Sequence, residues 1–406
     1  MKIDDKTSHN SPSIRFPEFT GEWKEERLSE IADIYKGAGI SKDQLSDNGE
    51  PCILYGELYT KYKTETITEV ISRTDIDNTK LVRSKANDVI IPCSGETAED
   101  IATARCVIKD GILLGGDLNI IRLHNYDGSF VSYQLNGKRK YDIAKVAQGV
   151  SVVHLYGEHL KGVKTVNPCL AEQKKISRFL SLLDERIAVQ NRLIDRLQSL
   201  MIGLNNSLYE QYGNDITTSF MELGYSYSGL SGKSAKDFGS GKPFITYLNV
   251  YSNIIVDETD YQYVRINDGE KQNIVRTGDV LFTLSSETPE EVGIGSVYLG
   301  EKEVYLNSFC FGIHIERNQL AYSPYLSYYV TSTAFRKFIY PFAQGSTRFN
   351  LCKADFEKAS IKLPSLDNQK RISAMLDCIA EKIRAEKAIL EYYNIQRQYL
   401  LRQMFI

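Results

Sequence analysis

The sequence predicts an α+β protein in which two similar mixed α/β domains are separated by two long, antiparallel, coiled-coil-like helices in a pseudo-two-fold arrangement. Three observations lead to this prediction: an internal repeat, a long helical apolar pattern after each copy, and short apolar runs bounded by turn residues elsewhere. With 406 residues, the chain is long enough for at least two domains that each bury a core.

The internal repeat is clearest between residues 168–177 and 364–373. Both segments carry the pattern P-x-L-x-x-Q-K/R-x-I-S, at a constant offset of 196 residues. The same offset relates 147–149 to 343–345, whereas it is 191 between 94–97 and 285–288. An offset that changes marks loops of different length in otherwise corresponding halves, so the chain is predicted to be a tandem duplication.

Each copy of this motif is followed by apolar residues at spacings of four and three, which predicts a helix of about 35 residues, or about 50 Å. So long a stripe favours pairing with a second helix, and the globular segment between the two requires them to run antiparallel. Gln190 and Glu386 fall at equivalent positions and suggest a shared polar layer. The alternative is two ordinary amphipathic helices, each packed on its own domain. The predicted helix-pair interface is Ile176, Leu180, Leu183, Ile187, Gln190, Ile194, Leu197, Met201 and Leu204 with Ile372, Leu376, Ile379, Ile383, Glu386, Leu390, Tyr393 and Leu400.

The remaining residues divide into a tail and two globular segments. The predicted boundaries are 1–19 for the tail, 20–170 and 213–366 for the domains, and 171–212 and 367–406 for the helices. Strands are expected at 51–55, 88–91, 118–123, 244–247, 278–282 and 312–315, and one helical segment per domain at 129–145 and 324–340.

Composition and motifs exclude several classes of protein. The chain has 49 Lys+Arg against 52 Asp+Glu, so it lacks the basic excess of a protein that grips nucleic acid unaided. Its seven cysteines include no C-x-x-C pair, and no apolar stretch approaches the roughly 20 residues of a membrane span, so a cytoplasmic location is expected. No metal-ligand pair of histidines, complete phosphate loop or nucleophile is recognisable, and no catalytic or metal-binding residue is predicted.

The duplicated half, the helix after each copy and the absence of a catalytic constellation resemble the specificity subunit of type I restriction–modification systems. The resemblance covers nearly the whole chain and includes residues 14–19, 21–23 and 28–37 and both helix starts. Asn368 departs from the glutamate that often precedes the motif glutamine, as at Glu172, and this affects only local capping.

The resemblance implies that each domain is a target recognition domain that reads one part of a split, asymmetric site on double-stranded DNA. It implies that the helices set the spacing and dock two modification subunits, which carry S-adenosylmethionine and methylate adenine. Two restriction subunits with ATP and magnesium would join for cleavage, and the bacterial assembly would associate with the nucleoid when bound to DNA. This chain itself would carry no cofactor and would not be an enzyme.

The repeat guides the choice of DNA-contacting residues, because loops placed equivalently in both halves but differing in side chains are suited to readout. The candidates in the first domain are Tyr59, Lys61, Lys63, Ser94, Glu96, Thr97, Gln148, Gly149, Ser151 and His154. Those in the second domain are Asn249, Tyr251, Ser285, Glu287, Thr288, Gln344, Gly345, Ser346, Thr347, Arg348 and Asn350.

Two alternatives to the specificity-subunit hypothesis stay open at this point. A stand-alone DNA enzyme would methylate or cleave DNA as the purified chain, and a non-catalytic coiled-coil scaffold would leave the methylation pattern of the genome unchanged when deleted.

Overall fold

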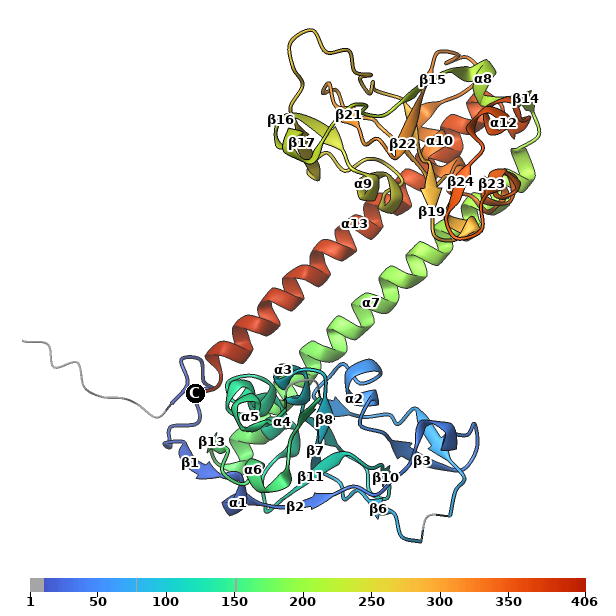
Figure 1. Ribbon diagram of the computed structural model, residues 1–406. Coiled ribbons are helices and arrows are strands. Elements are labelled where there is room, and N and C mark those ends of the chain that lie inside the picture. The colour runs from blue at the N-terminus through green and yellow to red at the C-terminus, as the bar shows by residue number, and fades with distance from the viewer. Residues whose placement is uncertain (1–10, 78, 150–151) are drawn as a thin grey trace, which may run out of the picture. The chain divides into compact units, whose positions relative to one another are not determined.

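The computed structural model describes residues 11–77, 79–149 and 152–406. These residues form two compact units, each with a mixed α+β domain (Figure 1). Unit 1 comprises residues 1–192 and 388–406, and unit 2 comprises residues 193–387. Each unit therefore combines its own domain with the first half of one long helix and the second half of the other.

The two long helices are α7 (Leu170–Tyr212) and α13 (Leu366–Gln403). Both begin at the leucine of the repeated motif, and the motif glutamine ties each helix start to its domain. Gln173 accepts a hydrogen bond from the backbone N–H of Asp127 at 3.0 Å. Gln369 likewise accepts one from Tyr322 at 2.8 Å. The repeat thus fixes where each helix leaves its domain.

The domain of unit 1 is built on a five-stranded sheet with the order β2 (Ala32–Lys36), β11 (Leu118–Leu123), β7 (Asp88–Pro92), β9 (Arg105–Val107) and β4 (Thr66–Ile67). A second sheet has the order β5 (Ser72–Thr74), β3 (Glu50–Ile53), β10 (Leu113–Leu114) and β6 (Val82–Arg83). Two further antiparallel pairs are β1 (Lys24–Arg27) with β13 (Lys164–Asn167) and β8 (Ser94–Gly95) with β12 (Val153–His154). The helices are α1 (Leu28–Ile31), η1 (Lys42–Gln44), α2 (Glu57–Thr60), α3 (Ala98–Ile101), α4 (Gly128–Asn136), α5 (Lys140–Val146) and α6 (Gly157–Leu160).

The domain of unit 2 repeats this plan with a sheet of order β15 (Gly224–Ser228), β22 (Cys310–Ile315), β18 (Val280–Thr283) and β20 (Gly295–Val297). The smaller sheets are β17 (Tyr261–Val264), β16 (Phe238–Ile245) and β21 (Tyr305–Leu306); β19 (Ser285–Ser286), β24 (Phe349–Leu351) and β23 (Ala343–Gln344); and β14 (Ile216–Thr218) with β25 (Ile361–Leu363). The helices are α8 (Phe220–Leu223), η2 (Ala235–Asp237), α9 (Tyr247–Ser252), η3 (Pro289–Glu291), α10 (Ser323–Tyr329), α11 (Thr333–Ile339), η4 (Tyr340–Phe342) and α12 (Lys353–Lys358).

The central strand β7 shows why each domain has three layers. Successive side chains of a strand point to opposite faces, and every residue of β7 is buried. Val89 and Ile91 belong to the core shared with Phe130 of α4. Ile90 packs on the other face, in the cluster that includes Leu114 of β10. In unit 2, β18 divides its residues between two cores in the same way.

The predicted α+β class, the two domains and the two long helices are confirmed, and the pseudo-two-fold relation of the domains stays a prediction. One detail was wrong: the single helical segments expected at 129–145 and 324–340 are each two helices, α4 with α5 and α10 with α11. The first pair is broken at Gly137, and the second at Ser332, whose hydroxyl caps α11 by accepting from Phe335 N–H. None of the helices in the described part of the chain is long and apolar enough to cross a membrane.

The long helices pair antiparallel in unit 1 and share one core in unit 2. In unit 1, Arg397 of α13 is bonded to Asp184 of α7, and Arg186 lies over the ring of Tyr393 at 5.4 Å. Arg186 comes after Asp184 in α7, but its partner Tyr393 comes before Arg397 in α13. The two segments therefore run in opposite directions. In unit 2, the first half of α13 and the second half of α7 enter one core, which includes Ile372 and Met201. Every residue of the predicted helix-pair interface is buried or half-buried.

Candidate nucleic-acid interface

The predicted contact loops of the first domain come together at one end of the central sheet. Ser94 of β8 pairs with His154 of β12, and their side chains approach to 3.4 Å between Oγ and Nδ1. Gln148 forms a two-way backbone bridge with His154, at 2.7 and 2.8 Å. Tyr59 donates its hydroxyl to the Ser94 carbonyl at 3.1 Å. Residue 59 and segments 94–97, 148–149 and 152–154 therefore form one surface, which we call loop cluster 1.

The second domain builds the same arrangement, which we call loop cluster 2. Ser285 of β19 pairs with Asn350 of β24, and Asn350 also pairs with Gln344 of β23. Tyr247 donates its hydroxyl to the Ser285 carbonyl at 2.9 Å. Burial raises the pKa of the Tyr59 and Tyr247 hydroxyls, so both stay neutral donors at physiological pH.

Backbone hydrogen bonds join the strands of each cluster in matching order. In cluster 1, Cys93 N–H donates to the Asp117 carbonyl at 2.7 Å, and Leu155 N–H donates to the Cys93 carbonyl at 2.8 Å. The corresponding bonds of cluster 2 are Leu284 N–H to Phe309 at 2.9 Å and Leu351 N–H to Leu284 at 2.8 Å. The two clusters therefore share one backbone scaffold that carries different side chains.

A glycine begins the turn of each cluster for a steric reason. Gly149 has φ of +125° and Gly345 has φ of +143°, values that residues with a Cβ rarely adopt. A Cβ on either residue would lie 2.1 Å from a carbonyl oxygen, that of Val152 or of Arg348. The predicted glycines thus shape the turn, and the variable side chains follow it.

Several predicted contact residues lie exposed on these clusters. Glu96, Gln148 and His154 are exposed in cluster 1, and Ser94 is half-buried. Ser151 falls outside the described residues. The exposed members in cluster 2 are Glu287, Thr288, Gln344, Gly345, Ser346, Thr347, Arg348 and Asn350. Ser285 is 4% exposed, and its hydroxyl accepts from Nε of Arg348 at 3.3 Å.

Asn249 does not belong to the surface on which it was predicted. Its side chain is 1% exposed, and its amide donates to the carbonyls of Asp257 and Asp260, both at 2.9 Å. Its Oδ1 accepts from Asp257 N–H at 2.9 Å. Because these bonds occupy the amide inside the domain, Asn249 shapes the loop after α9, and we leave it out of the proposed contacts.

Three further candidates have partners within their own domain. Lys61 donates to Glu57 and to Ser72, both at 2.7 Å, and Lys63 donates to the carbonyl of Tyr59 at 2.8 Å. Thr97 caps α3 by accepting from Asp100 N–H at 3.1 Å. These hydrogen bonds tie the three side chains to α2, β5 and α3 of the first domain.

Tyr251 stacks on Tyr247 with ring centroids 5.9 Å apart. A hydrogen bond to the Glu291 carboxylate raises the pKa of its hydroxyl. Tyr251 therefore supports Tyr247, the cluster 2 tyrosine, which was not among the site residues predicted from the sequence.

Sequence reasoning missed other residues of the clusters as well. Phe309 is 56% exposed beside Arg348, Val152 is 53% exposed, and Tyr156 stacks against His154 at 6.2 Å. The repeat holds a signal for one of them, since Val152 lies 196 residues before the candidate Arg348. Comparing every position at the repeat offset, polar or not, would have found Val152.

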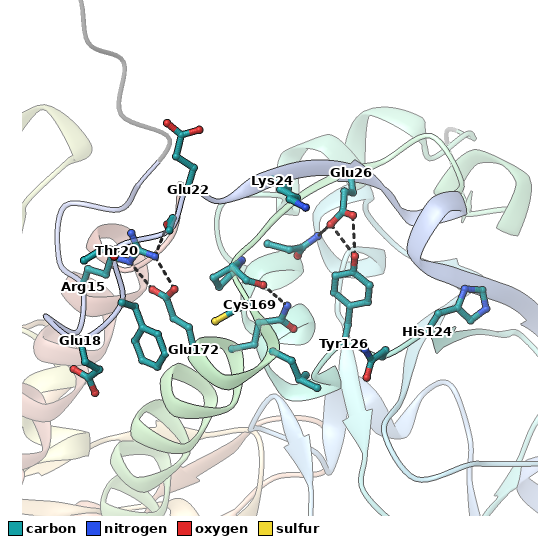
Figure 2. Close-up of a pocket in the computed structure, with 17 residues that line it drawn as sticks. Arg15, Glu18, Thr20, Glu22, Lys24, Glu26, His124, Tyr126, Cys169 and Glu172 are labelled. Carbon is teal, nitrogen blue, oxygen red and sulfur yellow. Dashed lines mark hydrogen bonds and ion pairs between the residues drawn. The ribbon is translucent and has the colours of Figure 1, made fainter.

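A cavity of about 520 Å³ lies beside the start of α7, and its lining shows how the N-terminal segment is held (Figure 2). Arg15 reaches Glu172 through two hydrogen bonds of 2.7 Å. Figure 2 also shows Tyr126 turned toward Glu26, which accepts from its hydroxyl at 2.8 Å. In unit 2, Asn368 stands in place of Glu172 and lies 3.4 Å from the Asp215 carboxylate. The residues that carry the family resemblance thus anchor the helix start.

No group of three His, Cys, Asp or Glu side chains placed to hold a metal ion occurs among the described residues. The two clusters instead offer exposed amides, hydroxyls, an imidazole and a guanidinium on a fixed backbone. Such groups can hydrogen-bond to the edges of bases and to phosphates.

Comparison with known proteins identifies the family. A family profile described as "Type I restriction modification DNA specificity domain" matches residues 20–199 and 230–392. The MjaVIII specificity subunit of Methanocaldococcus jannaschii is 21% identical over 403 residues, which cover 93% of this chain and 91% of that protein. The StySPI specificity subunit of Salmonella potsdam is 27% identical over 150 residues, or 37% of this chain and only 32% of that relative's length.

Solved structures share the fold. The type I restriction–modification S subunit from M. genitalium superposes with a TM-score of 0.59, at 16% identity, over 98% of this chain and 99% of its own. A chain from a structure of a type I system, described for its complex assembly and conformational transition, gives 0.57 at 18% identity, with 94% and 97% covered. With the family profile covering most of both domains, this chain belongs to the type I restriction–modification DNA specificity family.

Proposed function

We propose that this chain selects the DNA sequence for a type I restriction–modification complex, with each domain reading one half of a bipartite, asymmetric site. The observation that carries the proposal is the duplicated scaffold: one backbone arrangement occurs twice and carries different side chains in its two copies. A protein that reads two different half-sites needs such a repeated frame with separately variable contacts.

The long helices are proposed to set the spacing of the half-sites and to dock two methyltransferase subunits. Support comes from apolar side chains that the paired helices leave exposed. On α7 these recur along one stripe, at Leu182, Val189, Leu193 and Leu200, which are 38–55% exposed. On α13 they are Ile389, Tyr392, Ile395 and Tyr399. Exposed apolar stripes of this kind mark protein interaction surfaces.

The partner subunits would supply the chemistry and much of the electrostatic attraction. S-adenosylmethionine would bind the methyltransferase subunits, and ATP with magnesium would bind two restriction subunits where these are present. The near-neutral charge of this chain, formally −3, fits a subunit whose partners provide much of the phosphate contact.

The test is methylation in a host without such systems. The chain is expressed with its partner methyltransferase, and modified adenines are mapped across the genome. We expect one split motif that requires both proteins, and no methylation by the purified chain given S-adenosylmethionine. Methylation by the chain alone would contradict the non-catalytic assignment, and a pattern independent of the chain would contradict the proposal.

A second test concerns docking. Replacing Leu182 and Val189 together by glutamate should abolish co-purification with the methyltransferase, because two charges would have to be buried at the contact. Replacing exposed Lys337 by alanine, outside the two long helices, is the control. Retained co-purification of the double variant would remove this stripe from the proposed interface.

A further inference from the structure

Positions 152 and 348 occupy equivalent places on the two loop clusters. Each follows its glycine turn by three residues, and a Cβ on that glycine would meet its carbonyl oxygen at the same distance, 2.1 Å. Both side chains are exposed, yet one is apolar and the other is a cation. The backbone approach is thus the same at the two positions, whereas the side chains differ in charge and polarity.

Arg348 is held in place by two contacts that leave its terminal nitrogens without a hydrogen-bond partner in the described part of the chain. Its Nε donates to the buried Ser285 hydroxyl at 3.3 Å, and its guanidinium lies 5.9 Å from the centre of the Phe309 ring. The backbone of Phe309 is held in the sheet scaffold, because its carbonyl accepts from Leu284 N–H at 2.9 Å. Among residues 11–77, 79–149 and 152–406, neither terminal nitrogen of Arg348 has a hydrogen-bond or ion-pair partner within the protein.

A second arginine of the same domain shows the contrasting structural use. Arg336 donates to the carbonyls of Gly293, Glu290 and Val292, and it thereby joins α11 to the loop around η3. The terminal nitrogens of Arg336 are occupied within the protein, whereas those of Arg348 belong to an exposed side chain and are unused among the described residues.

An arginine with two unused, parallel donors matches the O6 and N7 acceptors of guanine in the major groove. Restraint by Ser285 and Phe309 favours such a directional contact, since less side-chain freedom is lost on binding. Valine offers no hydrogen bond and suits a contact with the methyl group of thymine.

We propose that Arg348 reads a guanine in the half-site of the second domain, and that Val152 makes the corresponding apolar base contact in the first. This inference rests on the proposed function, and it adds which residue determines specificity and for which base. Phe309 and Ser285 act as positioning residues for Arg348.

The experiment maps methylated adenines in cells that carry the partner methyltransferase and one variant of the full chain at a time. With Arg348→Ala, one guanine of the second half-site should lose its preference by roughly 10- to 100-fold, while the first half-site is unchanged. Arg348→Lys should not restore that preference, because an ammonium cannot form the parallel pair. Phe309→Ala should weaken it partially, and Lys337→Ala, which removes an exposed charge outside the cluster, should leave it intact.

The first domain gives an independent variant. Val152→Arg should change the base preferred at one position of the first half-site and leave the second half-site unchanged. An unaltered preference would overturn the equivalence of positions 152 and 348.

Other outcomes separate this inference from the proposed function. Uniform loss at all sequences with Arg348→Ala, rescued by Arg348→Lys, would identify a phosphate contact and overturn the inference alone. An unchanged motif with Arg348→Ala would also overturn it, while the wild-type motif would still support the proposed function. Absence of a chain-dependent motif in the wild type would overturn both.

Discussion

A buried aspartate lies at the start of the central strand in each domain, Asp88 as the first residue of β7 and Asp279 directly before β18, and the two domains pair it with different side chains. In unit 1, Asp88 is 1% exposed and receives two hydrogen bonds from Arg122, from Nε at 3.0 Å and from a terminal nitrogen at 2.8 Å. The guanidinium also lies over the ring of Tyr35 at 5.1 Å. The hydrogen bonds to Asp88 raise the pKa of the Arg122 guanidinium, which stays charged.

In unit 2, a histidine replaces the arginine at the matching position. Asp279 lies 2.7 Å from Nδ1 of His314 and accepts from the Tyr227 hydroxyl at 2.7 Å. The ring of Tyr227 stacks on the imidazole at 4.3 Å. Burial raises the pKa of Asp279, although hydrogen bonds from Arg276 N–H, Tyr227 and His314 act in the opposite direction. The charge of this carboxylate therefore depends on its neighbours.

We expect His314→Leu to destabilise the second domain by about 3 kcal/mol, because a buried carboxylate loses one partner while it keeps others. Hydrogen exchange of the amides in β18 and β22 measures this loss domain by domain. His124→Leu is the matched control, since His124 lies 2.9 Å from Asp33 but both side chains are more than half exposed. The control should cost under about 1 kcal/mol. Equal losses in both variants would contradict the role of burial.

Glu270 is a second titrating group in unit 2, and its lowered pKa predicts that the surrounding segment loses stability in acid. The Lys233 ammonium, with the backbone N–H of Asn267 and the Gln272 amide, lowers the pKa of Glu270 to about 2. Since this value lies below the ordinary one of 4.5, the stabilisation is complete above about pH 4.5 and is lost as the pH falls toward 2. Hydrogen exchange of residues 230–275, corrected for intrinsic rates, should therefore rise between pH 5 and pH 3. Glu270→Gln should reduce this pH dependence, and exposed Glu303→Gln should leave it unchanged.

At the scale of elements, one arginine fastens the end of α13 to unit 1. Arg397 donates from Nε to Asp184 of α7 at 2.6 Å and forms an ion pair with Glu65. Tyr133 of α4 donates to the same Asp184 at 2.6 Å. Burial acts to lower the pKa of Arg397, but the two carboxylates outweigh it and raise it. The repeat places Met201 at the matching position of α7, so unit 2 has no such cation there.

We expect Arg397→Met to lower the free energy of local unfolding of the last turns of α13 by roughly 3–5 kcal/mol. The reason is that Glu65 and Asp184 would remain buried without the arginine that pairs with them. Amide exchange over residues 388–403 measures the loss. Arg402→Met removes an exposed arginine of the same helix and should change exchange by less than about 0.5 kcal/mol. Wild-type protection in Arg397→Met would show that apolar packing alone holds this segment.

These elements also show how far sequence reasoning reaches. The repeat and the apolar spacing predicted α7, α13 and the loops that form the two clusters, because such patterns are local or recur at a fixed offset. Arg397 was not among the predicted contacts of the helices, since its partners lie more than 200 residues earlier in the chain. Asn249 looked like a surface contact for the same reason: its hydrogen bonds depend on the folded path of its loop.

For the molecule as a whole, duplication separates what must stay constant from what can vary. Gly149 and Gly345 share a positive φ and the same close approach to a carbonyl oxygen, and Gln173 and Gln369 preserve one helix start. Side chains between these fixed points differ freely, as Val152 and Arg348 do. Under the proposed function, we therefore expect a change of half-site to need only loop substitutions and a change of spacing to come from the helices.

This division of roles predicts the effect of lengthening a helix. Inserting four residues, about one helical turn, into the middle of α7 adds roughly 6 Å along its axis, the length of one to two base pairs. We expect the methylated motif to keep both half-sites and to gain one or two unread base pairs between them, because neither loop cluster is altered. Exchanging Arg348 in the inserted chain should then change one half-site at the new spacing. An unchanged gap, or an altered half-site without that exchange, would mean that the helices do not set the distance between the two sequences read.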